Sequence, residues 1–129
     1  TIGPALLLKH FVPLLAIDQR NIYAKLSARV GSISDNHKGG WYGYRAAKAA
    51  LNMVLQTAAI ELQRKNAELR VVALQPGTVR SNLSQAFANS VPHLLEPADS
   101  VTGMLAALKM LTSKSGAHYV DYKGEPIAW

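Results

Sequence analysis

Short apolar runs alternate with long segments of helical periodicity along this chain, and this alternation restricts the fold more than any other feature. The apolar runs at 22–26, 69–74 and 117–122 have the length and composition of strands. Between them, apolar residues recur at three- and four-residue spacings over 42–65 and again from Pro97 to about 111. Strands separated by long helices form βαβ units with parallel strands. The sequence therefore predicts an α/β fold.

Two further segments complete the expected order of elements. A helix is predicted from Gly3 to about Leu15, bent or ended near Pro13 because proline removes a helical hydrogen bond. Residues 27–40 are polar and rich in glycine, which predicts a loop after the first strand. Residues 82–95 have no clear pattern, and we expect a loop with a short helix there.

The composition excludes several classes of protein. The absence of cysteine excludes a disulfide scaffold and a zinc–thiolate site, and it fits a reducing, cytoplasmic compartment. The four histidines show no metal-ligand spacing, and no metal is expected. No apolar run approaches the roughly 20 residues that span a bilayer, so we expect no membrane segment. The net charge is +6, but the basic residues are scattered, which favours ordinary surface charge over a nucleic-acid site.

Tyr44 and Lys48 are the first candidates for chemistry. They are four residues apart in the second predicted helix and therefore share one face of it. A tyrosine has a pKa of about 10, and a nearby cation favours its phenolate and lowers that pKa. Such a pair can transfer a proton while a carbonyl and an alcohol interconvert. By itself the spacing is also that of an exposed tyrosine resting on a lysine stem.

The context of the pair gives it a more specific meaning. Tyr44 and Lys48 follow a strand and a glycine loop, and the next strand ends in Pro76-Gly77-Thr78-Val79-Arg80-Ser81. This order resembles the short-chain dehydrogenase/reductase family over essentially the whole chain. The amino-acid sequences of residues 29–36, 40–45 and 121–129 are similar to those of the C-factor (C-signal)-like subgroup.

The resemblance implies roles for individual residues. Tyr44 would be the catalytic acid/base, and Lys48 would bind the nicotinamide ribose and lower the pKa of the tyrosine. The residues expected to contact the cofactor, NADP or NAD, are Tyr44, Lys48, Pro76, Gly77, Val79 and Ser81. The substrate would be a small carbonyl or alcohol.

This sequence departs from the family pattern at the serine that polarises the substrate. The family usually has two serines at the end of the strand, and the second one polarises the substrate carbonyl. Here the pair is Ser27-Ala28, so alanine stands in that position. Ser32, 12 residues before Tyr44, is the candidate that supplies the hydroxyl instead, and Ser27 is a weaker one. Alternatively, Ser32 only caps a turn.

The resemblance also implies that part of the fold lies elsewhere. A dinucleotide site needs a glycine-rich turn for the pyrophosphate, and these 129 residues contain no such motif. We therefore expect residues 1–129 to be a single partial domain, the C-terminal half of a Rossmann-type doubly wound parallel sheet truncated at its N-terminus. Such a chain would be inactive alone.

Two other functions and an assembly follow as hypotheses. The subgroup resemblance implies a signalling or interaction protein as the alternative to an enzyme. The net positive charge gives a third and weaker hypothesis, a nucleic-acid-binding module. The family commonly pairs two helices across a dimer interface, so a homo-oligomer is expected. The residues proposed for that contact are Leu6, Leu7, Phe11, Leu51 and Leu55.

Overall fold

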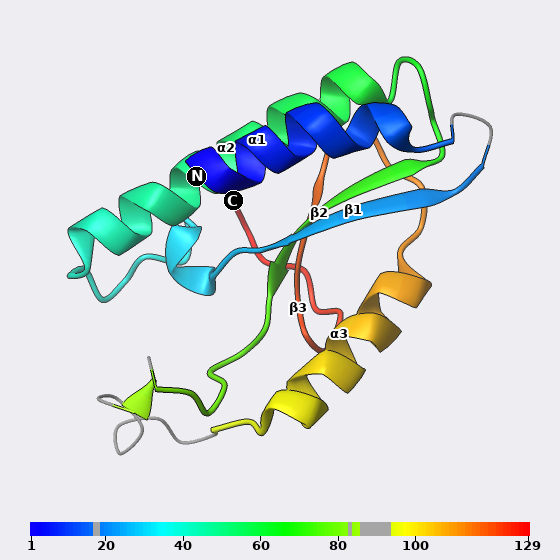
Figure 1. Cartoon of the computed structure of the whole chain (residues 1–129). Helices are drawn as coiled ribbons and strands as arrows, with labels where there is room; N and C mark the ends of the chain where they lie inside the picture. The colour runs from blue at the N-terminus through cyan, green and yellow to red at the C-terminus, as the bar shows by residue number, and fades with distance from the viewer. Residues whose placement is uncertain (17–18, 83, 86–93) are drawn as a thin grey trace.

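A three-stranded parallel sheet forms the centre of the molecule, as the alternation of elements predicts. The computed structural model describes residues 1–16, 19–82, 84–85 and 94–129. Strands β1 (Asn21–Leu26), β2 (Leu69–Gln75) and β3 (His118–Asp121) lie in the order β1-β2-β3, with β2 in the middle (Figure 1). The parallel register places Leu26 opposite Leu74. The carboxyl ends of β1 and β2 therefore meet at one edge of the sheet.

Helices cover both faces of this sheet. Helix α1 (Ile2–Phe11), which a short 3-10 helix (Val12–Leu14) continues, lies beside α2 (Tyr42–Leu62) on one face, and α3 (Pro97–Met110) lies on the other (Figure 1). The change of helix type at Val12 confirms the interruption expected near Pro13. None of the described helices is long and apolar enough to cross a membrane. Most of the segment 82–95, where we expected a loop with a short helix, is outside the described residues.

The core has one layer on each side of β2. Leu55 and Ala59 of α2 pack against Val71 and Ala73 on one face. Val72 and Leu74 point to the other face, toward α3. Because β2 is covered on both faces, its apolar run is continuous rather than alternating.

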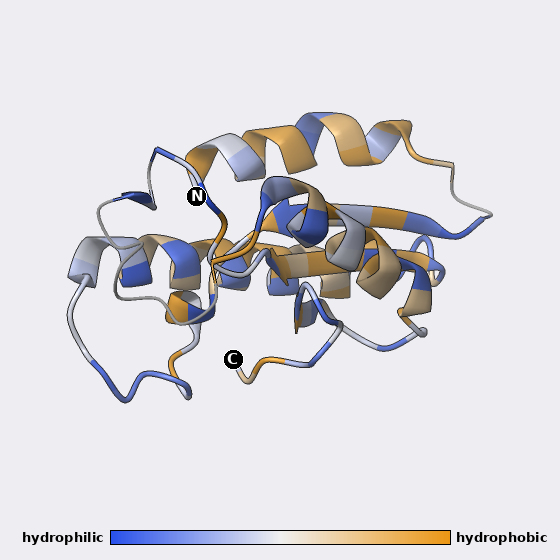
Figure 2. Cartoon of the chain, turned by 90° about the horizontal axis from the view of Figure 1, so that it is seen from below, coloured by the Kyte–Doolittle hydropathy of each residue, from blue (hydrophilic) through white to orange (hydrophobic). Residues whose placement is uncertain are grey.

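This packing corrects part of the proposed interface between copies. Leu51 and Leu55 are only 2% and 0% exposed, because both side chains point into the core beside β2. They cannot contact another chain. Leu6, Leu7 and Phe11 of α1 are exposed as expected, and Figure 2 shows how much of α1 is hydrophobic.

Candidate functional site

The beginning of α2 is set by an unusual turn at the carboxyl edge of the sheet. Three successive residues have left-handed backbones: Gly39 at φ 64°, Gly40 at φ 69° and Trp41 at φ 49°. Glycine adopts this region freely, whereas a tryptophan there is strained. The turn ends the loop 27–40 and starts the helix at Tyr42, two residues before Tyr44.

Arg45 holds this turn in place. Its guanidinium donates hydrogen bonds to the carbonyls of Gly39 at 3.0 Å, Gly40 at 3.0 Å and Val30 at 3.2 Å. It also lies 5.9 Å from the ring of Trp41. A planar guanidinium can bind several carbonyls at once, and lysine cannot replace it in that role. Sequence reasoning did not single out Arg45, because its three partners are brought together only by the fold.

The structure brings Tyr44 and Lys48 together as the spacing predicts. The Lys48 ammonium lies 5.8 Å from the centroid of the Tyr44 ring. It also donates a hydrogen bond of 2.9 Å to the carbonyl of Leu26, the last residue of β1. Tyr44 is 51% exposed. The pair therefore faces solvent from the carboxyl edge of the sheet.

The titration of the pair differs from the expectation. We expected Lys48 to lower the pKa of Tyr44, but partial burial raises the pKa of Tyr44 above 10.0. Burial also lowers the pKa of Lys48. Both shifts arise because a low-dielectric environment disfavours the charged form of each group. At neutral pH the Tyr44 hydroxyl therefore carries its proton.

The loop that follows β1 packs directly onto the Lys48 turn of α2. A Cβ at Gly31 would lie 2.8 Å from the Cβ of Lys48 and 2.9 Å from its carbonyl carbon. Real Cβ atoms do not approach so closely, so this contact requires glycine. Asn52, one helical turn after Lys48, is also buried against the loop and was not among the predicted site residues.

The two candidate serines are both buried in this loop. Ser32 is 2% exposed, and its hydroxyl accepts a hydrogen bond of 3.0 Å from the backbone of Asp35, which is the turn-capping role. Ser27 donates its hydroxyl proton to Oδ1 of Asn52 at 2.6 Å. Ala28, in the position where the family pattern has serine, accepts a hydrogen bond of 2.6 Å from the Tyr119 hydroxyl through its carbonyl. A catalytic role of Ser32 stays a prediction.

The Pro76-Gly77 turn lies at the same edge, at the end of β2. The carbonyl of Pro76 accepts a hydrogen bond of 2.6 Å from Ser100 at the start of α3. Gly77 has φ 80°, and a Cβ there would lie 2.6 Å from Leu95 and 3.1 Å from the ring of Tyr122. Glycine is thus required both by the backbone and by the packing of this turn.

The backbone groups of residues 78–80 point to two sides. On one side, the Thr78 carbonyl accepts a hydrogen bond of 2.9 Å from the Leu95 N–H, and the Arg80 N–H donates one of 2.8 Å to the Leu95 carbonyl. The backbone groups of the intervening Val79 therefore point away from Leu95. The Val79 carbonyl accepts a hydrogen bond from Ser84, whose hydroxyl also lies 3.3 Å from that of the exposed Ser81. Among the described residues no hydrogen bond is made by the Val79 N–H.

The parallel sheet with helices on both faces defines an α/β protein of Rossmann type, and the Tyr44–Lys48 pair lies at the carboxyl ends of its strands. The family model for short chain dehydrogenase matches residues 28–91. The chain is 30% identical over 128 residues to the C-signal of Myxococcus xanthus, covering 99% of this chain and 73% of that protein. The chain belongs to the short-chain dehydrogenase family.

Other relatives are longer. The chain is 30% identical to 1-hydroxy-2-glutathionyl-2-methyl-3-butene dehydrogenase of Rhodococcus sp. (strain AD45) and covers 55% of it. Among solved structures, it matches the carbonyl reductase Sniffer of D. melanogaster with a TM-score of 0.84 and 28% identity, covering all of this chain and 54% of that one. The NADPH-bound carbonyl reductase from chicken fatty liver gives the same TM-score, identity and coverage. The chain thus spans about half the length of these three relatives.

Proposed function

We propose that the full-length protein is an NAD(P)-dependent oxidoreductase that interconverts a small carbonyl and an alcohol, with Tyr44 as its acid/base. One observation carries this proposal: the Lys48 ammonium is fixed between the Leu26 carbonyl and the face of the exposed Tyr44 ring. A phenol beside an anchored cation, at the edge where α/β proteins bind ligands, is suited to proton transfer.

In this mechanism each residue has a separate task. The bound nicotinamide would supply the hydride that reaches the carbonyl carbon. Tyr44 donates its hydroxyl proton to the carbonyl oxygen, which becomes the alcohol hydroxyl, and the tyrosine is left as a phenolate. The Lys48 ammonium stabilises that phenolate. Because burial raises the pKa of Tyr44, the hydroxyl is protonated at neutral pH and can donate its proton to a carbonyl oxygen.

The cofactor fits the residues at this edge. Lys48 uses one of its three N–H groups on Leu26, which leaves two for ribose hydroxyls. The Val79 N–H, directed away from Leu95, can donate to the nicotinamide carboxamide, with Pro76, Gly77 and Ser81 around it. Two structural relatives, a short-chain dehydrogenase/reductase from Burkholderia multivorans with bound NADP and the NADPH-bound carbonyl reductase from chicken fatty liver, favour NADP over NAD as the cofactor.

We further propose that residues 1–129 are a single partial domain whose pyrophosphate site lies in the rest of a longer, cytoplasmic protein. The coverage of about half of several relatives supports this. The chain alone should then show no turnover of NAD(P)H.

Replacement of Tyr44 tests the assignment. In the full-length protein, Tyr44→Phe should lower NADPH-dependent reduction of an aldehyde by about 10²- to 10⁴-fold, because no acid replaces the hydroxyl. Tyr42 is a matched control, since it is the more exposed tyrosine at the start of the same helix. Tyr42→Phe should leave the rate unchanged. Equal rates for Tyr44→Phe and the wild type would refute the assignment.

A second candidate function is intercellular signalling, which one comparison favours. The chain covers 73% of the C-signal, against 55% of the Rhodococcus dehydrogenase. The exposed apolar side chains of α1, Leu6, Leu7 and Phe11, offer a surface for a second copy or another partner. If the Tyr44→Phe protein retained signalling, this function would be favoured over catalysis. Sedimentation of the Leu6→Glu protein, compared with the wild type, tests whether the protein forms an oligomer through α1.

A further inference from the structure

Asn52 is a buried polar residue on the same helical face as the proposed proton-transfer pair. Tyr44, Lys48 and Asn52 follow one another at four-residue spacing, so they form a stripe along α2. Along this stripe the exposure falls from 51% for Tyr44 to 3% for Asn52. A buried amide is costly unless its hydrogen-bonding groups find partners, so its partners show what it holds together.

The amide of Asn52 binds both ends of the loop that follows β1. Its Oδ1 accepts a hydrogen bond of 2.6 Å from the Ser27 hydroxyl, and its Nδ2 donates to the Gly31 carbonyl at 3.4 Å. Asn52 thus joins α2 to both ends of the segment 27–31.

The residue just before this segment anchors Lys48. Leu26 accepts the hydrogen bond of the Lys48 ammonium, and Gly31, the last residue of the segment, packs against the Lys48 backbone. If the segment moved away from α2, the Leu26 carbonyl would leave the ammonium. The lysine stem is flexible, so the ammonium would then turn toward solvent and away from Tyr44.

We propose that Asn52 is a positioning residue for the Tyr44–Lys48 pair: by holding the segment 27–31 against α2, it fixes the Leu26 carbonyl that anchors the Lys48 ammonium. The expected effect of Asn52 on turnover rests on the proposed function. The expected effect on the Lys48 ammonium does not rest on it, because the anchoring is a property of the folded chain.

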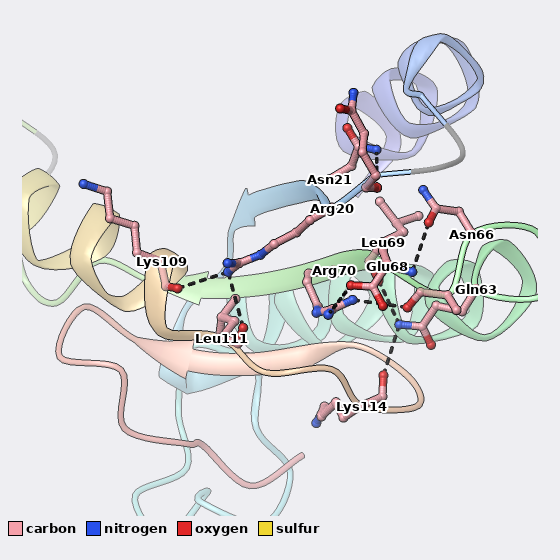
Figure 3. Close-up of polar contacts among 12 residues, drawn as sticks. Arg20, Asn21, Gln63, Asn66, Glu68, Leu69, Arg70, Lys109, Leu111 and Lys114 are labelled. Carbon is pink, nitrogen blue, oxygen red and sulfur yellow. Dashed lines mark hydrogen bonds and ion pairs between the residues drawn. The ribbon is translucent and has the colours of Figure 1, made fainter.

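Asn66 provides a matched control. It is also a buried asparagine with two backbone partners, the Ala16 carbonyl at 3.1 Å and the Glu68 N–H at 3.0 Å. It lies at the amino end of β2, the opposite edge of the sheet from Tyr44, where Figure 3 shows it beside Glu68. Asn66→Leu therefore removes the same kind of bonds without touching the Lys48 anchor.

The test compares Asn52→Leu with Asn66→Leu in the full-length protein. A displacement of about 1 Å at a reacting group can reduce the rate by about 10²-fold. We expect Asn52→Leu to lower kcat by about 10- to 100-fold with KM nearly unchanged, and to move the alkaline limb of the pH–rate profile. Asn66→Leu should leave kcat and the pH–rate profile unchanged, although it should lose a similar amount of stability. If Asn52→Leu does not fold, Ser27→Ala, which removes one of the two loop bonds, should give a smaller effect of the same kind.

A second readout separates this inference from the proposed function. The pKa of Lys48, which burial lowers, can be followed by NMR of the lysine Cε in the same variants. Asn52→Leu and Ser27→Ala should raise it toward the ordinary lysine value, because the released ammonium is solvated. A wild-type protein without turnover would refute the proposed function, and the Lys48 titration would still decide the inference. An unchanged Lys48 pKa in both variants would overturn the positioning role.

Discussion

The contact between Gly31 and Lys48 gives a prediction whose size can be worked out from the structure. In Gly31→Ala the new Cβ would lie 2.8 Å from the Lys48 Cβ, whereas ordinary contacts begin at 3.4 Å. The loop and the helix must therefore separate by about 0.6 Å, the difference between those two distances, to restore an ordinary contact. Neither atom belongs to a flexible chain end, so the backbone must move. Overpacking of this kind costs about 1–3 kcal/mol of unfolding free energy.

Urea denaturation of Gly31→Ala and the wild type measures this cost as a change in the unfolding midpoint. Gly43→Ala is the matched control: Gly43 lies in the first turn of α2, and a Cβ there meets no atom within 4 Å. Because alanine favours helix by up to about 1 kcal/mol over glycine, Gly43→Ala should be as stable as the wild type or more so. The turnover of the full-length protein should fall only in Gly31→Ala. A Gly31→Ala protein with wild-type stability and turnover would refute the close contact.

Three further predictions concern other parts of the fold. Leu55→Ala should lower the unfolding free energy by about 2–5 kcal/mol in urea, because Leu55 is fully buried, whereas the exposed Met53→Ala should change it little. Arg45→Lys should lower the same quantity by about 1–3 kcal/mol, since lysine cannot bind the loop carbonyls together, and an unchanged midpoint would contradict this role. Burial, Lys114 and Arg70 lower the pKa of His118, so the unfolded chain binds that proton more strongly and stability should fall as the pH drops below 6.5. His118→Leu should flatten this dependence, measured by thermal unfolding against pH.

The sequence predicts the elements of this fold well, because their signals are local. Apart from Arg70, the run 69–74 is apolar, and it lies in a strand buried on both faces, as the structure shows for β2. Pro13 marks the interruption after α1 for a reason that does not depend on the rest of the chain. The four-residue spacing of Tyr44 and Lys48 likewise places them on one helical face without knowledge of the fold.

What the sequence does not predict depends on contacts between distant residues. Leu51 and Leu55 have the periodicity of an apolar face, but periodicity does not say whether that face meets the sheet or another chain. Met53, which lies between them in the same helix, is exposed. Asn52 was overlooked because its partners, Ser27 and Gly31, lie more than 20 residues earlier.

The pKa of Tyr44 was misjudged for a related reason. Its change depends on how much of the ring is buried as well as on the charge beside it, and the sequence shows only the charge. In the structure, burial raises the pKa of Tyr44, so its hydroxyl is protonated at neutral pH.

Transfer of a labelled hydride is the most direct measurement of the central claim. The full-length protein would be incubated with an aldehyde and NADPH or NADH carrying deuterium at C4 of the nicotinamide, and the alcohol analysed by mass spectrometry. We predict deuterium on the carbinol carbon with the wild type and almost none with Tyr44→Phe. A wild-type protein that forms no labelled alcohol, or a Tyr44→Phe protein that forms it equally fast, would contradict the account.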